Sequence, residues 1–141
     1  MAAYDSQTQS KSTRNSRPFR DIDLDFGRNA ITNDVNVVED VIAIKRSVRN
    51  LIQTNFYERP FQPELGCGIR GLLFENYSPI IGIFLKRKIA EVITRYEPRV
   101  SLQDISLDDE PDKNRLKLSL YFYVQNISDP VTVETFLQRL R

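Results

Sequence analysis

Hydrophobic and polar residues alternate in three segments of the chain, which is the pattern of half-buried β-strands. Residues 21–26 read DIDLDF and place three apolar side chains between aspartates: Ile22, Leu24 and Phe26. Residues 100–107 alternate with a change of parity around residues 103–105, which predicts a β-bulge. Residues 116–124 alternate without a break through Leu116, Leu118, Leu120, Phe122 and Val124. These patterns predict an N-terminal strand and a later β-hairpin.

Two longer segments repeat apolar residues every three or four positions, as amphipathic helices do. The first covers residues 31–54, in which Asn36 and Glu39 resemble a capping box. The second begins at Ser78-Pro79, a favourable pair for a helix start, and ends before Pro98. The last residues, 131–141, read as a weak terminal helix.

The order of these elements indicates an α+β fold. We expect a small, mainly antiparallel sheet, formed by the N-terminal strand and the C-terminal hairpin, with the two main helices packed on one face.

Residues 5–17 contain no large apolar side chain, so burial cannot offset the entropy lost on ordering them. We therefore predict a flexible arm over residues 1–17 and a single domain over residues 18–141. The arm is basic, and it is either an inert tail, which we favour, or a segment that orders on an acidic or nucleic-acid neighbour.

Between the helices, residues 55–71 are rich in proline and glycine, which indicates a loop. We predict that this loop has a fixed structure, anchored by burial of Phe61 and Leu65. The residues expected to define its conformation are Arg59, Pro60, Phe61, Pro63, Glu64 and Gly66.

The composition favours protein partners. Apolar residues make up 40% of the 141 residues, enough for one modest core. The 20 basic and 19 acidic residues give a net charge of +1, so no global field attracts nucleic acid or an anionic membrane. No apolar run is long enough to cross a bilayer, and the N-terminus lacks the apolar core of a signal peptide. We expect production in the cytoplasm and no sequence-specific nucleic-acid or membrane partner.

Candidate catalytic residues are few. Histidine, the commonest general base and metal ligand, is absent, and the single Cys67 can form neither an internal disulfide nor a thiolate cluster. Glu64, Glu75 and Glu97 are carboxylates that a glycosidase could use in pairs. A structural role suits each of them better, since Arg99 beside Glu97 favours its ionised form. We expect no cofactor, no metal and no small-molecule substrate, and a cell-wall glycan hydrolase is the alternative function.

Four short motifs occur in a distinctive order: DIDLDF at the start, RPFQPELGC at residues 59–67, LFEN at residues 73–76 and Glu-Pro-Arg at residues 97–99. Together they resemble the small baseplate wedge subunits of contractile-tailed phages of the T-even type, whose relatives include the TssE component of type VI secretion. The resemblance covers residues 21–126. It implies a non-enzymatic structural subunit in the baseplate of a virion tail, assembled in the host cytoplasm. The type VI counterpart is an alternative setting.

The resemblance also implies two partners and a docking motif. The family's subunit binds the helical core bundle of larger wedge proteins and provides the template for tail-sheath assembly. The motif that engages the bundle corresponds to Glu97, Pro98 and Arg99. From the residues alone, a helix stop with an internal ion pair is the favoured interpretation, and the family motif reverses this preference. With the resemblance, we expect the two charges to be accessible to a partner and their removal to leave the isolated fold intact.

Overall fold

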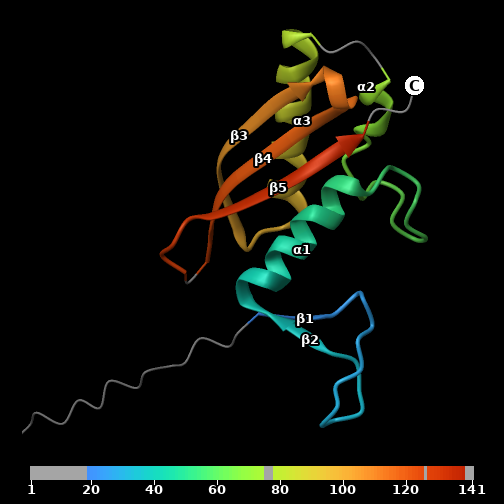
Figure 1. Cartoon of the computed structure of the whole chain (residues 1–141), viewed down its shortest axis with the longest axis vertical. Helices are drawn as coiled ribbons and strands as arrows, with labels where there is room; N and C mark the ends of the chain where they lie inside the picture. The colour runs from blue at the N-terminus through green and yellow to red at the C-terminus, as the bar shows by residue number, and fades with distance from the viewer. Residues whose placement is uncertain (1–18, 75–77, 126, 139–141) are drawn as a thin grey trace, which may run out of the picture.

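The main sheet has three antiparallel strands, and two helices cover one of its faces (Figure 1). The computed structural model describes residues 19–74, 78–125 and 127–138. The sheet has the order β3-β4-β5, with bounds Val100–Glu110, Arg115–Val124 and Val131–Gln138. A 3₁₀ turn, Pro111–Lys113, joins β3 to β4. The helices are α1, α3 and the single turn α2, with bounds Asp40–Gln53, Pro79–Tyr96 and Arg70–Leu73.

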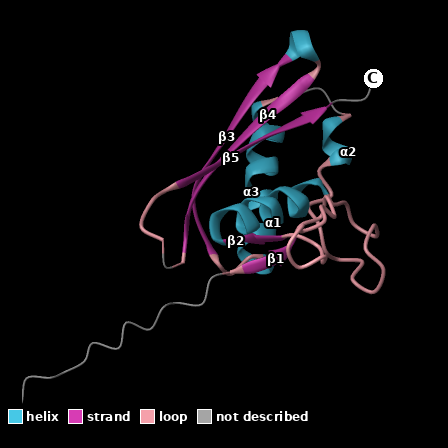
Figure 2. Cartoon of the chain, turned by 60° about the horizontal axis from the view of Figure 1, so that its bottom comes forward, coloured by secondary structure: helices cyan, strands magenta, loops and turns pink. Residues whose placement is uncertain are grey.

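The predicted α+β class and the packing of both long helices on one face are confirmed (Figure 2). The core lies between the sheet and these helices. From β4 it receives the alternating side chains Leu116, Leu118, Leu120, Phe122 and Val124, as the pattern predicted. From the helices it receives Ile44, Val48, Ile52, Leu85, Ile89 and Ile93.

The N-terminal strand does not join this sheet. β1, Arg20–Ile22, pairs instead with β2, Val37–Glu39, in a separate antiparallel hairpin. The third strand of the main sheet is β5, formed by residues that we expected to be helical. Its side chains alternate strictly between buried and exposed, and β-branched valine and threonine favour such a strand.

Helix α1 begins later than predicted because residues 35–39 pair with the N-terminal segment. Asn36 is therefore not the N-cap; Glu39 is, and its side chain makes no capping hydrogen bond. The first turn is held by Asp40, whose Oδ1 accepts a hydrogen bond from the Phe19 amide at 3.1 Å. The Asp40 amide donates to the Phe19 carbonyl at 2.7 Å, so the chain entering β1 is tied to the start of α1.

The strand predicted over DIDLDF is too long and wrongly oriented: β1 ends at Ile22, and residues 24–25 form a turn. Ile22, Leu24 and Phe26 point to solvent. Asp21 and Asp23 are half-buried and form ion pairs with Arg99 and Arg46, whereas Asp25 is exposed. Charge pairing rather than apolar burial thus orients this hairpin.

Helix α3 and strand β3 match their predictions closely. The Ser78 hydroxyl caps α3 by accepting a hydrogen bond from the Ile81 amide at 3.3 Å, and Pro79 occupies the first turn. The helix ends at Tyr96, with Pro98 two residues further on. The register of β3 against β4 shifts between Leu102 and Asp104, which confirms the predicted bulge.

The predicted arm over residues 1–17 and the candidate carboxylate Glu75 lie outside the described residues. Within the described residues, no helix combines the length and apolar character needed to cross a membrane.

Candidate docking site

The Glu-Pro-Arg motif forms a corner between α3 and β3. The Glu97 amide donates to the Ile93 carbonyl at 2.8 Å and closes the helix. Pro98, which cannot continue a helix, is exposed at the tip of the corner. Gln125 secures the turn from the end of β4: its side-chain amide donates to the Pro98 carbonyl at 2.9 Å and its backbone amide to the Arg99 carbonyl at 3.0 Å. The corner is therefore rigid.

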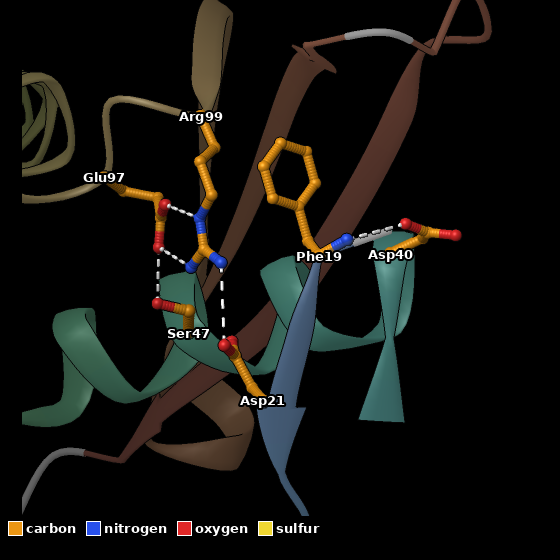
Figure 3. Close-up of polar contacts among 6 residues, drawn as sticks. All are labelled: Phe19, Asp21, Asp40, Ser47, Glu97 and Arg99. Atoms are coloured by element: carbon orange, nitrogen blue, oxygen red, sulfur yellow. Dashed lines mark hydrogen bonds and ion pairs between the residues drawn. The ribbon is translucent and has the colours of Figure 1, made fainter. Parts of the chain in front are cut away.

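The Glu97 carboxylate lies beneath this corner and is only 3% exposed (Figure 3). The Ser47 hydroxyl donates to Oε2 at 2.5 Å. The Arg99 guanidinium donates through Nε to Oε1 at 2.5 Å and through Nη2 to Oε2 at 2.8 Å. Burial alone would raise the pKa of Glu97, but the hydrogen bonds from Arg99 and Ser47 outweigh it and lower the pKa below its ordinary value. The carboxylate stays ionised.

Arg99 connects the corner to the N-terminal hairpin. Its Nη1 lies 3.6 Å from Asp21 Oδ1 on β1, and its guanidinium carbon lies 5.5 Å from the centre of the Phe19 ring (Figure 3). The Arg99 side chain is a quarter exposed. One guanidinium thus joins the end of α3, the start of β3 and strand β1. We call Ser47, Glu97, Arg99 and Asp21 the brace.

The expectation that both charges of the motif are accessible is wrong for Glu97. Its carboxylate is enclosed by the brace, so the internal ion pair that the residues alone allowed is present. Accessible at the corner are Pro98 and part of Arg99. Ser47 lies fifty positions from Glu97, and no sequence signal linked it to the motif.

Backbone hydrogen bonds join the loop after α1 to itself and to the end of that helix, but Phe61 does not anchor it. Phe61 is fully exposed, so its predicted burial is wrong. Leu65 is half-buried against the core, and the neighbouring Cys67 and Ile69 are the buried anchors. Burial raises the pKa of the Cys67 thiol to about 12, which keeps it protonated and unreactive.

An open groove of about 490 Å³ runs between this loop, α1 and the β1–β2 hairpin. Its lining is mixed: Leu51 and Leu65 are apolar, and Arg46 and Arg59 are charged. Tyr96, the residue before the corner, also lines it. The groove therefore extends from the loop to the residue that precedes the corner.

Glu64 and Glu97, the two candidate carboxylates that the structure describes, lie in different environments and form no glycosidase pair. Glu64 is on the surface, 3.5 Å from Arg95, while Glu97 is enclosed in the brace. Among the described residues, no group of three or more acidic, cysteine or histidine side chains could hold a metal ion. The site offers surfaces for contact with another macromolecule.

Solved structures first define the class of protein. The fold matches a chain of the anti-feeding prophage baseplate with a TM-score of 0.69 and 27% identity, covering 79% of this chain and 90% of that one. It also matches a chain of the postcontracted pyocin R2 baseplate (TM-score 0.50, 18% identity, 79% and 97% coverage). A crystal structure of a putative tail lysozyme from Geobacter sulfurreducens shares the fold as well (TM-score 0.65, 21% identity, 70% and 89% coverage). The fold is thus that of a baseplate component.

The family follows from the sequence relatives. The family model described as baseplate wedge protein gp25 matches residues 38–127. Baseplate wedge protein gp25 of Enterobacteria phage T4 is 33% identical over 92 residues, which cover 65% of this chain and 68% of the relative. The chain belongs to the baseplate wedge protein gp25 family. It is therefore a structural component of a virion tail baseplate, as the motifs indicated.

Proposed function

We propose that this chain is a non-catalytic wedge subunit that docks through the corner of residues 97–99 onto the helical core bundle of larger wedge proteins. In this proposal it also provides the template for the first tail-sheath subunits. The observation that carries the docking role is the exposed Pro98 on a corner held by the brace. A surface that is already rigid loses little conformational entropy on binding.

Because of the brace, the residues of the Glu-Pro-Arg motif have two different roles. Glu97 holds the corner from inside, through its hydrogen bonds with Ser47 and Arg99. Pro98 and the outer part of Arg99 meet the partner. In this arrangement Glu97 fixes the orientation of the Arg99 guanidinium, and the N–H groups that Glu97 and Asp21 leave free would bind carbonyl or carboxylate groups of the bundle.

The sheath role is supported by the edges of the main sheet. Strands β3 and β5 each pair with β4 on one side, and within the described residues neither has a neighbour on the other side. An incoming strand gains main-chain hydrogen bonds at such an edge. A sheath subunit that adds a strand to this sheet would start the first ring.

A glycan hydrolase is the second candidate, because one structural neighbour is described as a putative tail lysozyme. A glycosidase needs a carboxylic acid with a raised pKa to protonate the leaving group. Glu97 has a lowered pKa, and Glu64 is exposed beside Arg95. These environments favour the structural role.

The docking role is tested with variants at Pro98 in a phage that lacks this subunit. Pro98→Ala and the bulky Pro98→Trp replace an exposed ring and release the proline's backbone restriction, while Gln125 still holds the turn, so the purified proteins are expected to stay folded, within about 1 kcal/mol of the wild type. Both are expected to reduce the number of sheathed tails seen by electron microscopy. Pro130→Ala, at an exposed proline before β5, is the matched control and is expected to restore normal tails.

Normal tails from both Pro98 variants would contradict docking through the corner. Clearing of a peptidoglycan suspension by the purified wild-type protein would favour the hydrolase instead.

A further inference from the structure

The loop after α1 presents its largest side chains to solvent. Phe61 is fully exposed and Tyr57 is 85% exposed. Both residues have positive φ angles, 68° and 66°, which non-glycine residues with large side chains rarely adopt. Such backbone strain persists only where the surrounding structure imposes it, and it concentrates at functional sites. Neither ring is buried in the protein itself, so burial of these rings does not offset the strain.

Hydrogen bonds within the loop hold this conformation. The Tyr57 amide donates to the Pro63 carbonyl at 2.9 Å, across the base of the segment that carries Phe61. The Gln62 amide donates to the Arg59 carbonyl at 3.3 Å. At the loop's end, the Cys67 amide donates to the Thr54 carbonyl at 3.0 Å. The exposed rings are therefore carried on a preorganised loop.

The charged side chains of the loop differ in whether an oppositely charged side chain lies beside them. Glu58 accepts hydrogen bonds from Asn55 at 2.8 and 2.9 Å and lies 3.5 Å from Arg70. Glu64 lies 3.5 Å from Arg95. Arg59 forms no ion pair with any residue that the structure describes, and it lines the groove beside Leu65. The loop thus offers one uncompensated positive charge next to exposed aromatic rings.

We propose that Tyr57, Arg59 and Phe61, the loop surface, form a second docking site for a neighbouring baseplate protein. The partner's surface is an apolar pocket that takes the Phe61 ring, with a carboxylate at its edge that pairs with Arg59. Aromatic and arginine side chains dominate binding energy at protein interfaces, and a fixed loop presents them at a small entropic cost. The inference rests on the proposed assembly into a baseplate, but it uses residues separate from the corner of residues 97–99.

The test adds purified full-length protein, at limiting concentration, to an extract of cells infected with a phage that lacks this subunit. Sedimentation then measures the subunit incorporated into baseplate-sized particles. Phe61→Ala and Arg59→Glu are each expected to lower incorporation at least tenfold, with melting temperatures close to the wild type. Ile31→Ala and Arg49→Glu, at exposed positions away from the loop, are the matched controls and are expected to incorporate normally.

A photoreactive benzoylphenylalanine at position 61 identifies what the ring meets. In assembled particles it is expected to cross-link to another baseplate protein at an apolar site with a nearby carboxylate. Normal incorporation of both Phe61→Ala and Arg59→Glu would overturn the proposal, and so would a markedly lower melting temperature for Phe61→Ala. If Pro98→Trp blocks incorporation while the loop variants do not, the corner alone docks. If the wild type itself fails to incorporate, the proposed function fails.

Discussion

Glu97 and Arg99 lie two positions apart, on either side of a proline, and their carboxylate and guanidinium groups meet beneath the corner. Placing a carboxylate in the interior is unfavourable unless hydrogen bonds and an opposite charge offset the lost hydration. Ser47 and Arg99 supply three such hydrogen bonds to the two oxygens of Glu97. At the scale of single residues, the motif is therefore a structural element of the monomer as well as a candidate docking element.

Removing the carboxylate leaves the arginine without its main partner. Breaking a buried pair from one side typically costs about 3–5 kcal/mol, so Glu97→Ala is expected to lower the free energy of unfolding by about 3 kcal/mol. Glu91→Ala, at an exposed position on the same helix, is the matched control and is expected to change it by less than about 0.5 kcal/mol. Urea unfolding of the two purified variants gives the comparison. Equal unfolding midpoints would mean that the brace contributes nothing to the monomer.

The same carboxylate makes stability depend on pH. The folded protein lowers the pKa of Glu97 from its ordinary value of 4.5, so the folded state favours the ionised form. This stabilisation is complete above the unfolded pKa and is lost as pH falls through the lower folded pKa. In Glu97→Gln the titrating group is absent. We expect its difference in unfolding free energy from the wild type to be largest above about pH 5 and to shrink in more acidic solution. A difference that is constant from neutral to acidic pH would place the acid sensitivity elsewhere.

At the scale of elements, the loop after α1 is defined by backbone geometry more than by burial. Gly66 has a φ of +130°, and a Cβ added there would lie 2.5 Å from the Thr54 carbonyl oxygen. Only glycine accepts both this angle and this approach of the backbone. The glycine thus lets the loop return to α1 and bring Cys67 into the core.

Gly66→Ala is therefore expected to destabilise the protein by more than about 1 kcal/mol, because alanine is incompatible with the native angle. Gly71→Ala is the matched control. Gly71 lies in α2 with nothing within 4 Å of an added Cβ, so alanine is expected to be neutral or slightly stabilising there. Thermal unfolding of both variants is the measurement. A Gly66→Ala variant as stable as the wild type would show that the loop can take another path.

At the scale of the whole molecule, the two sheets are stabilised in different ways. The three-stranded sheet shares an apolar core with α1 and α3. The β1–β2 hairpin is attached by ion pairs: Asp23 and Asp25 contact Arg46, and Asp21 contacts Arg99. Hydrogen bonds and ion pairs of this partly exposed kind open locally far more often than a packed core. The hairpin is therefore expected to open independently of the rest.

Asp23→Ala removes the more buried of the two carboxylates that hold Arg46. We expect amide hydrogen exchange to accelerate in residues 20–39 while exchange in β4 stays unchanged, because β4 belongs to the separate core. Asp129→Ala, at an exposed position before β5, is expected to leave both regions unchanged. Equal acceleration in the hairpin and β4 would mean that the two sheets unfold as one unit.

Local patterns predicted the elements whose neighbours in sequence decide their structure. The limits of α3 follow from Ser78, Pro79 and Pro98, which act within one turn of the helix. The buried face of β4 and the bulge in β3 follow from unbroken and broken alternation. The prediction of a helix over the residues of β5 was wrong because so short a segment fits both a helical and a strand period. Pairing with a neighbouring strand decides between them.

By itself, the sequence determined the α+β class, the two long helices, the β3–β4 hairpin and, through motif order, the family. Only the tertiary structure decided that Glu97 is buried against Ser47, that Asp23 turns inward to pair with Arg46, and that Phe61 points to solvent. The physical reason is common to all three. Hydrophobic periodicity and helix-ending residues such as proline act over a few positions of the chain. The burial of a side chain depends instead on which distant segment packs against it.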